Sequence, residues 1–122
     1  MINGVGHTYI TGKSYYSEVY YSRYYYYDVR IFITNYNDVD YHIDGLGYRL
    51  LSKHEGATTE YESSYSISDP IVYVKSNRTI KIKFEIGEFN SNSGYKEFIE
   101  GKTFELYFGN TKLATVNLGN LK

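Results

Sequence analysis

The sequence contains no cysteine and no tryptophan, and only one proline and one methionine in 122 residues. Without cysteine, neither a disulfide framework nor a zinc site with thiolate ligands can form. A chain of this length still buries enough apolar surface to fold without such crosslinks. We therefore expect one domain over residues 1–122, held together by its hydrophobic core, and the lack of cysteine leaves the redox compartment open.

An excess of charge and a long apolar run are also missing. The formal net charge is −1 at pH 7 and the isoelectric point is near 6.3, whereas a dedicated nucleic-acid-binding domain is usually strongly basic. No segment approaches the roughly 20 consecutive apolar residues that span a bilayer, so we expect no membrane span. Residues 1–6 lack the basic and apolar parts of a signal peptide. Two alternatives follow: a cytoplasmic protein, if residues 1–122 are the full native chain, or a mature extracytoplasmic domain whose leader has been removed.

Tyrosine is the residue in excess, with 17 copies, and a period of two dominates the chain. From Thr79 to Gly87, isoleucine and phenylalanine alternate with threonine, lysine and glutamate, as in an antiparallel strand with one buried face. The stretch 103–118 repeats this alternation on both sides of Gly109-Asn110, a dipeptide typical of a tight hairpin turn. Only the stretch from Tyr95 to Glu100 is compatible with a short helix or turn.

These patterns predict an all-β fold of roughly eight strands, arranged as an antiparallel, immunoglobulin-like β-sandwich. A closed barrel is less consistent with the sequence, because the strand lengths are unequal and no repeated glycine marks barrel corners. We expect residues 1–16 to form a peripheral strand or a flexible arm. The predicted strands are 6–11, 17–22, 24–34, 41–51, 58–66, 71–75, 79–87 and a hairpin over 103–118.

The order of features between residues 29 and 118 resembles a family of bacterial immunoglobulin-like domains found in Gram-positive lipoproteins of unknown function. A long strand ending in Thr34-Asn35 is followed by a polar turn and by the apolar and aromatic stretch 41–51. A second polar turn leads into the alternating stretch 75–86, and the hairpin 104–118 closes the pattern. The resemblance implies the fold and an extracytoplasmic role in interactions, and it brings no catalytic residues. The sequence has no lipobox and no N-terminal cysteine, so surface anchoring is not implied.

The tyrosine tract is the first candidate binding site. In the predicted strand 24–34, alternation that buries the aliphatic residues leaves Tyr24, Tyr26 and Arg30 on the outer face. Tyr20 belongs to the preceding predicted strand. We predict that these four residues contact a ligand, because tyrosine offers rigid aromatic area together with a hydroxyl group. The alternative is a cross-strand aromatic ladder that only stabilises the sheet.

A second candidate is the acidic stretch that contains Asp38, Asp40, His42 and Asp44. Alternation would place these side chains on one face, and oxygen-rich clusters suit calcium. The spacing does not match the calcium loop of an EF-hand, and no glutamate stands in the bidentate position. A solvated acidic turn is the favoured interpretation, so we expect no metal site and keep the three aspartates only as weak candidates.

No arrangement of residues typical of an enzyme stands out. The serines lie in no nucleophile elbow, the three histidines are far apart, and no glycine-rich stretch has the setting of a phosphate-binding loop. We therefore predict a non-enzymatic, cofactor-free module that recognises a protein or an envelope component at a bacterial cell surface through its tyrosine-rich strand. Two alternatives stay open: a carbohydrate-binding module that stacks sugars on exposed tyrosines, and a small intracellular or phage-encoded inhibitor or adaptor that docks on a host protein. Nucleic acid is not an expected partner, and the sequence leaves the oligomeric state open.

Overall fold

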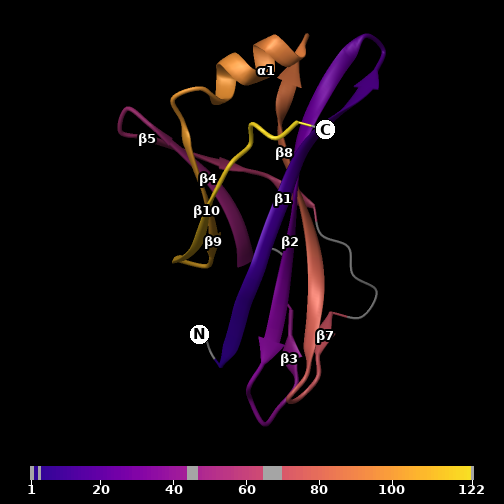
Figure 1. Cartoon of the computed structure of the whole chain (residues 1–122), viewed down its shortest axis with the longest axis vertical. Helices are drawn as coiled ribbons and strands as arrows, with labels where there is room; N and C mark the ends of the chain where they lie inside the picture. The colour runs from indigo at the N-terminus through magenta and orange to yellow at the C-terminus, as the bar shows by residue number, and fades with distance from the viewer. Residues whose placement is uncertain (1, 3, 44–46, 65–69, 122) are drawn as a thin grey trace.

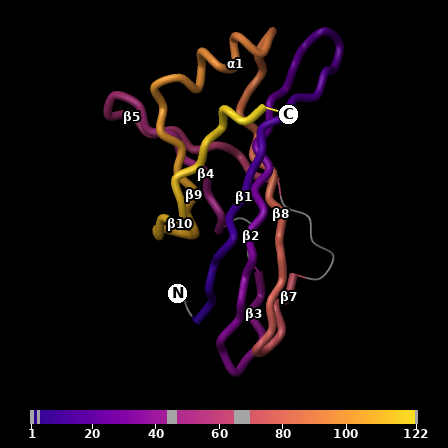
Figure 2. Tube along the Cα trace, in the orientation of Figure 1, coloured from indigo at the N-terminus to yellow at the C-terminus, as the bar shows by residue number. Residues whose placement is uncertain are grey.

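Strands make up most of the structure, and the only helix in its described part is short (Figure 1, Figure 2). The computed structural model describes residues 2, 4–43, 47–64 and 70–121. All the strand pairs in this part of the chain are antiparallel, apart from one isolated bridge. The predicted all-β, antiparallel class is confirmed, whereas its immunoglobulin-like character stays a prediction.

Two four-stranded sheets carry the fold, with strand orders β1-β2-β8-β6 and β10-β9-β4-β5, and β3 pairs with β7 in a two-stranded sheet. The first sheet consists of β1 (Val5–Val19), β2 (Ser22–Asn35), β8 (Asn77–Phe89) and β6 (Ser63–Ser64). The second sheet consists of β10 (Thr111–Val116), β9 (Thr103–Phe108), β4 (Tyr48–His54) and β5 (Ala57–Tyr61). The remaining elements are β3 (Tyr41–His42), β7 (Ile71–Val72) and the helix α1 (Asn92–Ile99).

Alternation along the strands decides which side chains form the core. Every second residue of β8 from Ile80 to Ile86 is buried, and so is every second residue of β2 from Tyr25 to Ile33. These side chains share one hydrophobic cluster with Leu50, Phe104 and Leu106 of the second sheet. Burial of one such aliphatic or aromatic side chain stabilises the fold by about 1.5–3 kcal/mol, so the two sheets are held together by the core that they share.

The N-terminal region differs from the predicted pattern. The predicted strand 6–11 and the first three residues of the predicted strand 17–22 belong to one long edge strand, β1, whose register with β2 shifts after Thr8. Tyr20 and Tyr21 form the two-residue turn between β1 and β2. The prediction that Tyr20 lies on a strand is therefore wrong, and the reason is that a tyrosine pair carries none of the usual turn residues.

Three further predicted strands have different bounds. The predicted strand 41–51 is divided into β3 and β4, and β4 continues to His54. The predicted strand 58–66 corresponds to β5 and β6, interrupted at Glu62, and its last two residues lie outside the described part of the chain. The predicted strand 71–75 contains only the two residues of β7. Turns and breaks of this kind depend on the pairing partner, which a local pattern does not reveal.

The hairpin and the helix follow local signals more closely. β9 and β10 pair around Gly109-Asn110, which confirms the predicted turn. The helix begins at Asn92, three residues before the predicted stretch, because Ser91 acts as its N-cap. The Ser91 hydroxyl accepts a hydrogen bond from the backbone N–H of Gly94 at 3.2 Å.

A buried aromatic cluster attaches α1 to the first sheet. The rings of Tyr25 and Tyr95 stack with centroids 4.4 Å apart, and the Phe89 ring meets both of them edge-on. The Tyr25 hydroxyl donates a hydrogen bond to Asn92 Oδ1 at 2.6 Å, and the Tyr95 hydroxyl donates one to Ser14 Oγ at 2.9 Å. A helix of eight residues is not stable alone, so these tertiary contacts hold it in place.

Candidate functional site

The outer face of the first sheet, opposite the core, carries three of the four predicted contact residues. Tyr24, Tyr26 and Arg30 alternate with buried residues of β2, as the sequence predicts. Arg30 is exposed, and both tyrosines are half-buried. Tyr20 does not share this face, because it lies in the turn at the end of the hairpin with 93% of its surface exposed.

Tyr26 is flanked by side chains from both neighbouring strands. Its ring centroid lies 5.5 Å from that of Tyr15, the residue opposite it on β1. On the β8 side, the Lys83 ammonium group lies 4.7 Å from the Tyr26 ring centroid. Cross-strand pairs of this kind stabilise a sheet. Tyr26 therefore takes part in a cross-strand ladder, and less of its ring is available for stacking a ligand than its position alone suggested.

Asp28 is a buried charged residue on the same face, with 4% of its surface exposed. Its carboxylate accepts a hydrogen bond from the Tyr15 hydroxyl at 3.2 Å and forms an ion pair with Lys81 Nζ at 3.2 Å. Burial and the nearby Asp28 carboxylate raise the pKa of Tyr15 to about 12, so this hydroxyl remains a hydrogen-bond donor at neutral pH. Sequence reasoning did not identify Asp28 as a site residue, because its burial depends on side chains from two other strands.

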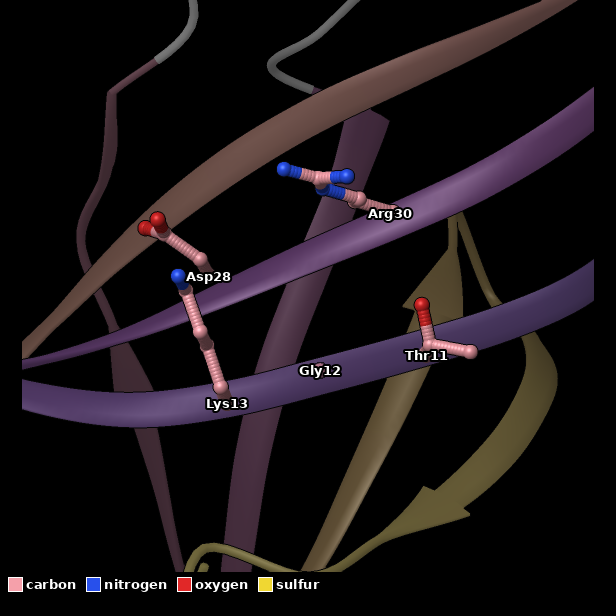
Figure 3. Close-up of a pocket in the computed structure, with 5 residues that line it drawn as sticks. All are labelled: Thr11, Gly12, Lys13, Asp28 and Arg30. Carbon is pink, nitrogen blue, oxygen red and sulfur yellow. The ribbon is translucent and has the colours of Figure 1, made fainter. Parts of the chain in front are cut away.

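An open hollow of about 300 Å³ lies beside Asp28, between β1 and β2 (Figure 3). In Figure 3, the side chains of Lys13, Asp28 and Arg30 extend to the same side of the two strands, and Lys13 reaches from β1 toward Asp28. Within the described part of the chain, neither Lys13 nor Arg30 has an ion-pair partner, whereas Asp28 is compensated by Lys81. The hollow therefore presents an excess of positive charge, which suits an acidic group on a ligand.

Gly12 lines the same hollow and connects it to the core. A Cβ atom at this position would lie 2.1 Å from the hydroxyl oxygen of Tyr27. Tyr27 is buried, and that burial raises its pKa to about 12. Only glycine leaves room for the Tyr27 side chain here. The position of Tyr27 in the core and the path of the β1 backbone beside the hollow therefore depend on each other.

A second, smaller hollow of about 220 Å³ opens on the β8 side of Tyr26. Its lining includes Ser63, Ser64 and Lys83 together with Tyr26 itself. The outer face thus has two concave areas, one beside Asp28 between β1 and β2 and one beside Tyr26 on the β8 side. Sequence reasoning could not find this second hollow, because β6 reaches β8 only through tertiary pairing.

The acidic turn after β2 has another role in the described residues. Asp38 Oδ1 forms an ion pair with Lys75 Nζ at 3.1 Å, and Asp40 Oδ1 accepts a hydrogen bond from the backbone N–H of Val74 at 3.0 Å. Asp44, the third weak metal candidate, lies outside the described residues. Among the residues described, no group of three or more metal-binding side chains occurs. These two carboxylates connect the turn to the loop before β8.

Glu105 on the second sheet is surrounded by donors. Its carboxylate forms ion pairs with Lys53 and Lys112 at 2.9 Å each and accepts a hydrogen bond from the Tyr107 hydroxyl at 3.0 Å. Hydrogen bonds from Lys112, Lys53 and Tyr107 lower the pKa of Glu105 to about 2. Because an unfolded glutamate has a pKa of about 4.3, Glu105 stabilises the fold above that pH, and this contribution is lost as the pH falls toward about 2.

Glu105→Gln should therefore lower the melting temperature at pH 7, and the difference from the wild type should shrink below about pH 4 and vanish near pH 2. Thermal unfolding followed by circular dichroism across this range measures the effect. The control is Glu60→Gln, because the Arg49–Glu60 ion pair is exposed to solvent and pairs of that kind contribute little. A melting-temperature difference between Glu105→Gln and the wild type that does not change with pH would contradict the lowered pKa of Glu105.

A helix long and apolar enough to cross a membrane does not occur in the described part of the chain. Comparisons of the chain with protein-family models, with curated proteins and with solved structures found no match.

Proposed function

We propose that the protein is a non-catalytic binding module that recognises a partner protein through the outer face of its first sheet. The observation that carries this proposal is the pair of cations, Lys13 and Arg30, which border an open hollow without ion-pair partners in the described residues. An acidic side chain of the partner would enter the hollow, and Tyr24 and Tyr26 would supply aromatic contact area further along the same face of β2.

The chemistry of these groups suits a protein interface. Arginine binds carboxylates through two parallel hydrogen bonds, and arginine and tyrosine are enriched among the residues that dominate binding energy. The side chains stand on paired strands that need little ordering when a partner binds, which favours affinity. A location at the cell envelope and membership of the lipoprotein-domain family stay predictions.

Carbohydrate stacking is supported less well than protein binding. A sugar ring needs one open aromatic face, and the Tyr26 ring has Tyr15 on one side and the Lys83 ammonium group nearby. Tyr24 is only half-exposed, and the exposed ring of Tyr9 on the same face meets the Phe32 ring edge-on, with centroids 5.8 Å apart. We therefore favour a protein over a glycan as the partner.

The double variant Arg30→Gln/Tyr24→Ser should retain at least tenfold less of the partner, which corresponds to a loss of binding free energy of about 1.4 kcal/mol or more. Neither side chain belongs to the core, so the melting transition should change little. The measurement is affinity purification with the tagged chain from an envelope fraction and from a soluble lysate, with each retained protein quantified.

The matched control is Lys96→Gln, which removes an exposed cation on α1, away from the hollow. This variant should retain the same protein as the wild type, and retention should fall as salt is added. Equal retention by the Arg30→Gln/Tyr24→Ser variant and the wild type would contradict the proposed function. Release of the retained material by a soluble glycan would instead support the carbohydrate alternative.

A further inference from the structure

The turn between β1 and β2 presents apolar side chains at a protruding end of the molecule. Tyr20 and Tyr21 are 93% and 103% exposed, and Val19 before them is 45% exposed. In Figure 1, this end of the hairpin stands clear of the second sheet. We call Val19, Tyr20 and Tyr21 the hairpin tip.

The backbone of the hairpin tip makes the choice of tyrosine unusual. Tyr20 and Tyr21 have φ angles of 50° and 72°, and positive φ at both central residues is the geometry of a type I′ turn, for which Asn-Gly is the usual sequence. Tyrosine is disfavoured in this conformation, and two exposed rings gain nothing from the core. A residue pair that combines backbone strain with exposed apolar surface points to a role in binding.

A hollow of about 580 Å³ lies at the other end of β1. We call it the end hollow; it lies between the start of β1 and β10, with Tyr36 at its border. Its lining is mainly apolar and includes Ile2 and Leu113, which are partly exposed, and Val5, which is fully buried. Its one histidine, His7, has Nε2 2.7 Å from the Tyr48 hydroxyl, and burial lowers the pKa of that imidazole, which keeps it neutral at pH 7.

The hairpin tip and the end hollow cannot meet within one molecule. β1 runs from Val5 to Val19, and 14 steps of about 3.3 Å separate its ends by about 45 Å. A contact between these two surfaces therefore requires two copies of the chain.

We propose that the protein associates head to tail, with the hairpin tip of one copy seated in the end hollow of the next. A convex pair of aromatic rings and a concave apolar surface are complementary in shape and polarity. Beside the tip, Glu18 and Arg23 form an ion pair at 2.9 Å. Beside the hollow, Glu105 is shared by Lys112 and Lys53, so that side carries a net positive charge and the tip side carries none. No like-charge repulsion opposes the contact.

This geometry makes two predictions about the assembly. Because the two surfaces differ, the contact is heterologous, so copies add in one direction to form chains or a ring rather than only two-fold dimers. Because a single tip buries much less than the roughly 1,200 Å² of a stable interface, the association is weak and needs protein concentrations of about 100 µM or more.

Sedimentation velocity of the full chain from about 10 µM to about 1 mM tests the proposal, because weak contacts of this size populate in that range. The average mass of the wild type should rise with concentration. The Tyr20→Asn/Tyr21→Gly variant should stay monomeric and melt no lower than the wild type, since it has the preferred type I′ sequence. Thr8→Arg should also stay monomeric, because Thr8 is an exposed residue that lines the end hollow.

The matched control is Tyr9→Asn, which replaces another exposed tyrosine at positive φ, 49°, and should associate like the wild type. Mixing the tip variant with Thr8→Arg combines one intact hollow with one intact tip, so the mixture should form 1:1 dimers and nothing larger. A monomeric wild type over the whole range would overturn the proposal. So would association of the tip variant, association of Thr8→Arg at the level of the wild type, or a mixture that remains monomeric.

Discussion

Tyr25→Ala should lower the free energy of unfolding by about 3–5 kcal/mol, as expected for the removal of a fully buried aromatic side chain. Tyr25 has no exposed surface, and its ring stacks on Tyr95 and contacts Tyr16 and Phe89. The substitution would open a cavity between the first sheet and α1. It would also remove the hydrogen bond to Asn92 at the start of the helix. Urea denaturation followed by circular dichroism measures the loss.

Two companion variants separate the causes of this effect. Tyr25→Phe keeps the ring and removes only the hydroxyl group, so it should cost about 1 kcal/mol. Tyr24→Ala changes the neighbouring residue, which points to the outer face, and should cost less than about 1 kcal/mol. If Tyr24→Ala were as destabilising as Tyr25→Ala, the alternation that assigns Tyr25 to the core and Tyr24 to the outer face would be wrong.

Asn35→Ala should destabilise the fold by about 3 kcal/mol, because it removes the hydrogen-bond partner of one buried and two part-buried backbone groups, and an unsatisfied buried group costs about 1–3 kcal/mol. Asn35 is fully buried at the end of β2. Its Nδ2 group donates hydrogen bonds to the carbonyl oxygens of Val39 at 2.9 Å and Val72 at 3.0 Å. Its Oδ1 atom accepts a hydrogen bond from the backbone N–H of Asn37 at 2.9 Å. One side chain therefore joins the turn after β2 to β7.

The measurement for Asn35→Ala is again chemical denaturation, with hydrogen exchange of the amide of Asn37 as a local probe. Exchange at this amide should accelerate, because its acceptor is lost. Asn90→Ala is the control, since Asn90 is exposed in the loop before α1 and surface changes of this kind stay within about 0.5 kcal/mol. A loss for Asn35→Ala no larger than that of the control would contradict the role assigned to Asn35.

Part of the candidate site followed from the sequence alone. Alternation on β2 placed Tyr24, Tyr26 and Arg30 on one face, because a period of two needs only the strand itself. The contribution of Lys13 was not predictable, since it depends on how β1 pairs with β2 across a shifted register. Tyr20 was misplaced, because its turn is formed by residues that usually avoid positive φ.

The sequence by itself determined the all-β class, the inward and outward faces of β2 and β8, and the hairpin at Gly109-Asn110. Each of these depends on the chemistry of residues close together in the chain. The tertiary structure decided the burial of Asp28, the packing of α1 on Tyr25, and the separation of the hairpin tip from the end hollow. These features depend on which distant strands meet and in what register, and an alternating pattern pairs equally well in several registers until the shared core selects one.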